Sequence, residues 1–241
     1  MNTKEQTIVL GDISIEVIRK DIKNIHLSVY PPQGKVKISA PLRMDMETIR
    51  VFIISKTAWI RKQQARFQSQ NRETIRECIP RESHYYLGKR YLLKVIEQNG
   101  PARILLRHST LDMYVRPNTP VEKRQNLLAE WYRSQLKALL PSYIAAFEKK
   151  MNLTIAEFRI RKMKTKWGTC NPKARRIWLN LELAKKPMEC IEYIIAHEMV
   201  HLLERHHNER FTDYMDKFLP QWKQNKAELG RLPLGHVDWE E

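Results

Sequence analysis

The sequence predicts an α+β fold, in which a β-rich amino-terminal part with one long helix precedes a more helical carboxy-terminal part. Short segments of alternating apolar and polar residues, such as Ile13–Val17, are frequent in residues 1–118. Longer segments with helical periodicity are frequent in residues 119–241. The second part also contains the stretch Ile191–Phe211, which includes the sequence HEMVH. We therefore expect a β-rich region over 1–118 and a domain with the functional site over 119–241.

The β-rich region is expected to contain two hairpins and three further strands. Its long helix should run from Met46 to about Ser69, because Asp45 is a good N-cap and the apolar residues that follow have helical spacing. Pro31–Gly34 and Gly88-Lys89 are turn signals that connect the hairpin strands. The expected strands are Ile13–Val17, His26–Tyr30, Lys35–Ala40, Tyr85–Leu87, Tyr91–Ile96, Ile104–Leu106 and Met113–Val115. The sequence contains no evident internal repeat.

The carboxy-terminal part is expected to begin with a capping box at Thr119–Glu122 and a helix that Pro141 kinks or divides. Strands over Phe158–Lys166 and Ile177–Leu181 should then form a hairpin, joined by a loop. A helix should follow Pro187, and another amphipathic helix should run from Glu209 to Glu228.

Composition restricts the class of protein. The chain has 241 residues and a net charge of +16, which favours polyanionic partners such as DNA, RNA, nucleotides or acidic proteins. The three cysteines, Cys78, Cys170 and Cys190, are far apart and odd in number, so we expect free, packed thiols in a reducing compartment. The first residues lack a secretory pattern, and no apolar run approaches a membrane span. We expect a cytoplasmic protein.

The HEMVH sequence has the spacing of a metal site. His197 and His201 are one helical turn apart, so both imidazoles lie on one face and can bind one Zn²⁺. Glu198 lies beside them, where it can act as general base on a metal-bound water. A third ligand is needed, and helix geometry leaves His207, His206 and Glu204 open. His207 can reach the metal only if the helix ends near Glu204–His206 and the chain turns back.

The stretch from Lys164 to Trp222 resembles the YgjP-like metallopeptidase domain, a relative of the WLM and SprT-like zinc proteases. The matching residues are Trp167-Gly168-Thr169-Cys170, Leu179-Asn180, Pro187, Glu192-Tyr193, HEMVH, His207-Asn208, Phe211 and Leu219–Trp222. The resemblance implies a zincin-like fold, one Zn²⁺ per chain and peptide hydrolysis. It also implies that His207 is the third ligand. Thr169, Glu192, Asn208 and Thr212 depart from the family's usual residues, but none is a ligand.

A second group of residues is basic and surrounds the start of the resemblance. Lys162, Lys164 and Lys166 alternate before Trp167, and Arg175 and Arg176 follow it. If these side chains lie beside the cleft, they can contact substrate or nucleic-acid phosphates, with Trp167 as a stacking surface. The alternative is a solvated strand face with Trp167 anchored in the core. The resemblance to zincins also implies that a strand of the sheet above the metal helix, 158–166 or 177–181, pairs with an extended peptide.

Three functions fit these residues. The first is a zinc metallopeptidase in which Glu198 transfers the proton of the attacking water to the leaving amine. The second keeps the metal but hydrolyses a nucleotide, since similar proteins are described as pyrophosphatases acting on UTP. The third is a nucleic-acid-associated protein with a structural zinc, which would not need the carboxylate of Glu198. Among the remaining residues, His26, His84, His108 and His236 are assigned to structural or surface roles.

Overall fold

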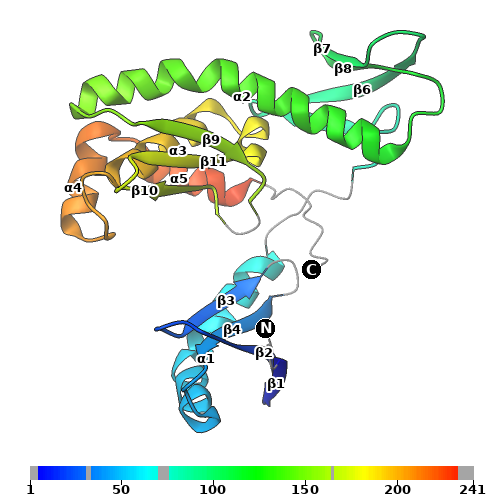
Figure 1. Ribbon diagram of the computed structural model, residues 1–241. Coiled ribbons are helices and arrows are strands. Elements are labelled where there is room, and N and C mark those ends of the chain that lie inside the picture. Colours follow the sequence, from blue (N-terminus) through cyan, green and yellow to red (C-terminus); the bar gives the residue numbers. More distant parts are fainter. Residues whose placement is uncertain (1–4, 31–33, 70–75, 164–165, 233–241) are drawn as a thin grey trace. The chain divides into compact units, whose positions relative to one another are not determined.

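The computed structural model describes residues 5–30, 34–69, 76–163 and 166–232, which form two compact units, Met1–Asn71 and Arg72–Glu241. The described residues contain three small sheets and five α-helices, so the predicted α+β class is confirmed (Figure 1). The expected boundary between residues 118 and 119 lies inside the second unit. The reason is that strands before this position and helices after it share one hydrophobic core.

The first unit is a four-stranded sheet followed by one helix. Its elements are β1 (Glu5–Leu10), β2 (Ile13–Lys20), β3 (His26–Tyr30), β4 (Lys35–Pro41) and α1 (Met46–Ser69). The strand order is β1-β2-β4-β3. β1 pairs antiparallel with β2, β2 parallel with β4, and β3 antiparallel with β4. The predicted hairpin of His26–Tyr30 with Lys35–Ala40 is therefore confirmed, although most of its turn, at 31–33, lies outside the described residues.

Helix α1 begins where the sequence predicts and closes the core of the first unit. A side-chain oxygen of Asp45 accepts a hydrogen bond from the Thr48 amide at 2.7 Å, as an N-cap does. Ile49, Ile53 and Ile60 lie on one face at helical spacing and are completely buried against the sheet. This helix and the four strands before it therefore build one hydrophobic core.

The second unit begins with a sheet of the same topology. Its strands are β5 (Ser83–Tyr86), β6 (Lys89–Glu97), β7 (Arg103–Leu106) and β8 (Thr110–Val115), in the order β5-β6-β8-β7. The outer pairs are again antiparallel and the central pair is parallel. A long helix, α2 (Val121–Met151), again follows. The topology is thus repeated, although the sequence contains no evident repeat.

Helix α2 differs from the prediction at its start and in its middle. Pro120, and not Thr119, is the N-cap, and its side chain has no atom that can accept a hydrogen bond. The Thr119 hydroxyl donates to the Arg116 carbonyl instead. The predicted capping box is therefore wrong. Pro141 lies inside one continuous helix rather than dividing it. The residues buried along α2 include Leu128, Leu136 and Ile144, and the helix contacts both sheets of the second unit (Figure 1).

The third sheet corrects the prediction of a hairpin over 158–181. Its strands are β9 (Glu157–Arg161), β10 (Gly168–Asn171) and β11 (Arg176–Asn180), in the order β10-β11-β9. β9 and β11 are parallel, and the antiparallel hairpin is formed by β10 and β11. The extra strand arises because the predicted connecting loop is long enough to form β10. β11 is therefore the central strand.

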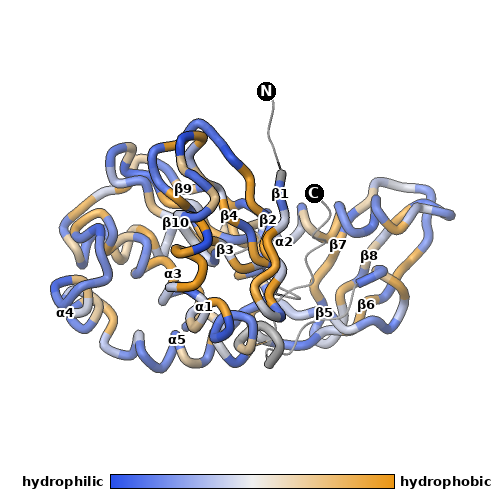
Figure 2. The backbone as a smooth tube through the Cα atoms, turned by 90° about the horizontal axis from the view of Figure 1, so that it is seen from below, coloured by the Kyte–Doolittle hydropathy of each residue, from blue (hydrophilic) through white to orange (hydrophobic). Residues whose placement is uncertain are grey.

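A short 3-10 helix, η1 (Leu181–Lys185), and three α-helices complete the second unit. The helices are α3 (Met188–Val200), α4 (Glu209–Phe218) and α5 (Trp222–Arg231). The predicted single helix over 209–228 is wrong, because it breaks at Leu219–Gln221, where Pro220 disfavours a helical residue before it. Figure 2 shows α4 as largely hydrophilic, consistent with its narrow buried stripe of Phe211, Met215 and Phe218. In the described chain, no helix is both long and apolar enough to cross a membrane.

Candidate metal centre

Helix α3 holds the first two histidines in a fixed position. Pro187 is its N-cap, and the helix is buried over most of its length against β10, β11, α2 and α5. It ends at Val200, with His201 as C-cap, and the next three residues form a tight turn in which the Glu204 amide donates to the Val200 carbonyl at 2.9 Å. Because the helix stops at this point, the chain can turn back towards His197.

The returning chain brings the third histidine to the first two. Asn208 is the N-cap of α4, and its side-chain oxygen accepts from the Phe211 amide at 3.0 Å. This cap fixes the residue immediately before it, His207. The Nε2 atoms of His207 and His197 are 3.0 Å apart, and the ring centroids of His207 and His201 are 4.7 Å apart. The condition for His207 to reach the metal, an early helix end followed by a return, is thus fulfilled.

Phe211 forms a common base for the three imidazoles. Its ring centroid lies 5.0, 4.8 and 4.7 Å from those of His197, His201 and His207, respectively. The Phe211 side chain is buried, so it cannot move away without opening the core. On the other side, the Tyr193 ring packs edge-on against His197 at 5.7 Å. The rings are therefore oriented by packing before any ligand is bound.

The three residues fit a metal ion. One ring nitrogen from each histidine lies within 4.8 Å of the others. Nδ1 of His201 is 3.0 Å from the Glu204 carbonyl, which leaves Nε2 free to coordinate. Burial, and then the two neighbouring imidazoles, lower the pKa of His197 to about 3, so this ring is neutral and has a lone pair available. Three neutral imidazoles are a donor set that suits Zn²⁺.

Glu204 and His206, the other candidates for the third ligand, lie outside the histidine cluster. A carboxylate oxygen of Glu204 accepts from the His206 amide at 3.0 Å, and the carboxylate is therefore directed along its own loop. The His206 side chain is exposed. Neither residue belongs to the cluster of His197, His201 and His207 that can hold a metal.

Glu198 is buried next to this cluster and in close contact with β10. The residue is only 5% exposed, and burial raises the pKa of its carboxyl to about 8, although Lys166 acts in the opposite direction. A Cβ atom added to Gly168 would lie 2.6 Å from both Cγ and Oε1 of Glu198. Only glycine therefore allows the carboxylate to stay in this position. Sequence reasoning missed the role of Gly168, although its place in the Trp-Gly-Thr-Cys motif was a signal.

Asn180 holds the chain that leads into β10. Its Nδ2 donates to the carbonyls of Met163 and Lys166, both at 2.8 Å, and its backbone amide donates to the Trp167 carbonyl at 2.9 Å. Within the described residues, Asn180 makes no hydrogen bond with the three histidines. Its hydrogen bonds instead hold the chain just before Gly168, the residue that lies against Glu198. The sequence could not reveal this role, since it depends on the position of the loop.

The predicted basic group does not form one patch. Lys162 and Lys166 are exposed near the Asn180 end of the sheet, whereas Arg175 and Arg176 lie at the opposite end of β11. Arg175 donates through its guanidinium to the Thr154 carbonyl, and Arg176 is 3.5 Å from a carboxylate oxygen of Glu157. Lys164 lies outside the described residues.

Two aromatic residues near this group have different environments. Trp167 is half-buried and packs against the core, with the Lys186 Nζ atom 5.7 Å from its ring centroid. Trp178 lies on the other face of the sheet, where the Arg161 guanidinium stacks at 3.8 Å from the ring centroid. Sequence reasoning singled out Trp167 and missed the pair of Arg161 and Trp178, because parallel pairing of β9 with β11 was not foreseen.

A comparison with protein-family models matches residues 23–232 to the description "YgjP-like, metallopeptidase domain". The chain belongs to the YgjP-like metallopeptidase family. Membership identifies it as a hydrolase with protein substrates, and the three histidines can hold the metal ion of this YgjP-like protein. The resemblance based on the sequence is thus confirmed, and it extends well beyond Lys164–Trp222.

Comparisons with individual proteins add little to the family match. Among solved structures, the chain is similar to the metallopeptidase zymogen of Pyrococcus abyssi abylysin, with 20% sequence identity and a TM-score of 0.35. The similarity covers 37% of this chain and 90% of the abylysin chain. No curated protein matched the sequence.

Proposed function

We propose that this YgjP-like protein is a zinc peptidase, with His197, His201 and His207 as ligands of one catalytic Zn²⁺ and Glu198 as general base. One observation carries the proposal: three imidazoles that can hold a metal converge beside a buried carboxyl group that is not one of the ligands. A purely structural zinc site would gain nothing from such a carboxylate. Burying it costs free energy, so its retention there favours a catalytic role.

The protein residues have separate roles in the reaction. A bound zinc ion would lower the pKa of a coordinated water towards neutrality and polarise the scissile carbonyl. Glu198 accepts the proton of the attacking water and later donates it to the leaving amine. Gly168 and Asn180 keep the carboxylate in place. The Phe211 ring packs against all three imidazoles and fixes their relative positions.

The substrate is proposed to bind along β10. This strand is an edge of its sheet and, among the described strands, pairs only with β11, so its outer backbone groups are available to an extended peptide. Its first residue, Gly168, contacts Glu198, which places the peptide next to the general base. The strand at 177–181 is a poorer candidate, because β11 is paired on both sides.

The basic side chains have a secondary part in this proposal. Lys162 and Lys166 are exposed near the Asn180 end of the sheet, and Lys166 is close enough to influence the pKa of Glu198. They are positioned to attract acidic substrates or nucleic-acid phosphates. Arg175 and Arg176 already have protein partners and are weaker candidates.

The function is tested by offering purified, zinc-loaded protein an unstructured protein and, separately, UTP. Peptide cleavage should be abolished by a chelator and restored by Zn²⁺, and it should be absent in Glu198→Gln. Hydrolysis of UTP with no peptide cleavage would replace the peptidase by a nucleotidase. Zinc binding with neither activity, and with tight nucleic-acid binding, would favour the structural role. Parallel reactions with DNA reveal whether nucleic acid changes the rate.

A further inference from the structure

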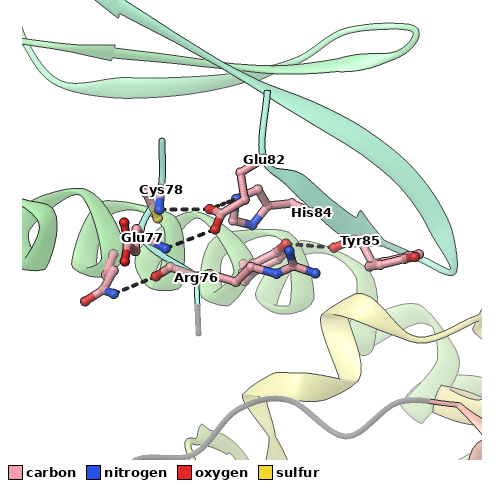
Figure 3. Close-up of polar contacts among 8 residues, drawn as sticks. Arg76, Glu77, Cys78, Glu82, His84 and Tyr85 are labelled. Carbon is pink, nitrogen blue, oxygen red and sulfur yellow. Dashed lines mark hydrogen bonds and ion pairs between the residues drawn. The ribbon is translucent and has the colours of Figure 1, made fainter. Parts of the chain in front are cut away.

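The segment that leads into β5 forms an unusual turn. Cys78 and Arg81 have backbone φ angles of 53° and 67°, a left-handed conformation that is unfavourable for a non-glycine residue. The turn is held by backbone hydrogen bonds, including one from the Arg81 amide to the Leu93 carbonyl at 2.8 Å. It brings Cys78 back to Glu82 and His84, as Figure 3 shows.

Three side chains of different chemistry meet inside this turn. Oε2 of Glu82 accepts from the Cys78 amide at 2.8 Å and is 3.0 Å from Nε2 of His84. Oε1 of Glu82 accepts from the Glu77 amide at 3.0 Å. The sulfur of Cys78, a carboxylate oxygen of Glu82 and a ring nitrogen of His84 all lie within 4.8 Å of one another. Cys78 is 1% exposed and His84 is 3% exposed, so the cluster is buried.

We propose that Cys78, Glu82 and His84 form a second metal site, separate from the histidine cluster, that binds Zn²⁺ or a similar thiolate-preferring divalent cation. Thiolate, carboxylate and imidazole are the three zinc donors that proteins use. On binding, the neutral His84 ring would carry its proton on Nδ1 and offer Nε2 to the metal, and Cys78 would release its thiol proton to solvent. The fourth position would be left to water.

Charge balance favours occupation of this site. One thiolate, one carboxylate and one neutral imidazole would form an uncharged complex with a divalent cation, which suits a buried position. Arg76, Arg124 and Lys185 are the cations that act on Cys78 or His84. These three side chains would repel a metal complex with a net positive charge, but they would not repel a neutral one. Burial, and then Glu82, raise the pKa of the Cys78 thiol to about 11, while Arg124 and Lys185 act in the opposite direction. A bound divalent cation would supply the charge that stabilises the thiolate.

The location indicates a stabilising role. Cys78 belongs to the same hydrophobic core as α2 and the helices of the histidine cluster. The carbonyl of Arg76 accepts from the Gln125 side chain at 2.7 Å, which fastens the turn to α2. A metal ion would therefore fix residues 76–84 against the core that supports the catalytic helix. It would contribute to the folding stability of the second unit and would not enter the chemistry.

The test uses Co²⁺ as a spectroscopic probe on the full chain. The three residues of the histidine cluster offer no sulfur ligand, so a thiolate-to-cobalt charge-transfer band in the near ultraviolet can come only from a cysteine site. We expect wild-type protein to bind two equivalents of Co²⁺ and to show this band. Cys78→Ser should bind one equivalent and lose the band. Cys170→Ser and Cys190→Ser, the matched controls, should keep both.

His84→Gln provides a second variant if Cys78→Ser folds poorly, and it should also lose one equivalent. Binding of a single equivalent without a charge-transfer band in wild-type protein would overturn the proposal and leave a hydrogen-bonded cluster. A band that persists in Cys78→Ser would overturn it as well, because another thiol would then be the ligand.

Discussion

The two units of this protein begin with the same arrangement and use it differently. β1–β4 with α1, and β5–β8 with α2, have the same strand order, the same pattern of parallel and antiparallel pairs, and the same place for the helix in the chain. In the first unit, α1 closes a core that it shares with its own sheet. In the second, α2 shares its core with the helices and strands of the histidine cluster as well.

The first hairpin turn of each sheet illustrates the difference. Both turns contain a Leu-Gly pair, and Gly11 and Gly88 have φ angles of 60° and 78°. No atom of the described chain lies within 4 Å of a Cβ atom added to Gly11, but one added to Gly88 would lie 2.8 Å from Cγ of Pro187, the N-cap of α3. The second turn thus packs against the start of α3, whereas the first turn has no comparable contact in the described chain. The two sheets therefore share a topology and differ in the elements that pack against them.

The largest effect is expected at the metal. His207→Ala should lower bound zinc from near one equivalent per chain at the histidine cluster to near zero and abolish hydrolysis, because two imidazoles remain. His206→Ala and Glu204→Ala, the matched controls from the same loop, should retain the metal. Zinc bound per chain is measured by elemental analysis after dialysis. All variants also carry Cys78→Ser, so that zinc at the second proposed site is not counted. Equal zinc in all three variants would place the third ligand at another residue.

Gly168→Ala should separate metal binding from chemistry within the second unit. The new methyl group would collide with the Glu198 carboxylate but not with the histidines. Zinc content should therefore stay unchanged while kcat/KM falls about 10²-fold, the loss that a displacement of roughly 1 Å causes. Gly230→Ala, where a methyl group meets no described atom, is the control and should remain active. Full activity in Gly168→Ala would show that β10 does not hold the carboxylate.

The pair of turn glycines tests the comparison of the two units directly. Gly11→Ala should lower the free energy of unfolding by about 1–2 kcal/mol, the cost of a left-handed alanine. Gly88→Ala should lower the free energy of unfolding by about 1–3 kcal/mol more than Gly11→Ala, because the added methyl group is overpacked against Pro187. Chemical denaturation of both variants, with zinc affinity measured in parallel, gives the answer. Equal losses, with zinc affinity unchanged in Gly88→Ala, would contradict a supporting role of the second turn.

The smallest effect concerns the basic surface. Replacing Lys162 and Lys166 with Gln should reduce the slope of log affinity for duplex DNA against log salt, by about 0.9 for each phosphate that the protein no longer neutralises. Lys56→Gln with Lys62→Gln, exposed on α1 of the first unit, is the matched pair and should leave the slope unchanged. If only the Lys56 and Lys62 variant lowers the salt slope, DNA binds to the first unit and not to Lys162 and Lys166.

Local features could be predicted well from the sequence, and long-range pairing could not. Asp45 and the spacing of Ile49, Ile53 and Ile60 defined α1, because caps and helical faces are local properties. The parallel pairing of β9 with β11 brings together residues far apart in the chain, and no local signal specifies it. The repeated topology was hidden for the same reason.

The candidate site followed a similar division. The spacing of His197 and His201 predicted their common face, and the family resemblance supplied His207. The Trp-Gly-Thr-Cys motif singled out Gly168 but could not indicate its contact with Glu198, since β10 was expected to be loop. Cys78 and His84 were judged separately as structural residues, and only the left-handed turn brings them together.

The central claim is that Glu198 performs the chemistry on a metal that the histidines hold without it. Glu198→Gln preserves the shape of the side chain and removes its basicity. We predict that the variant keeps wild-type zinc content and melting temperature, while turnover of the best protein substrate falls at least about 10²–10⁴-fold. Zinc content and turnover should be measured on the same preparation. Wild-type turnover with zinc bound would contradict the mechanism, and loss of zinc would show that Glu198 supports the metal rather than the reaction.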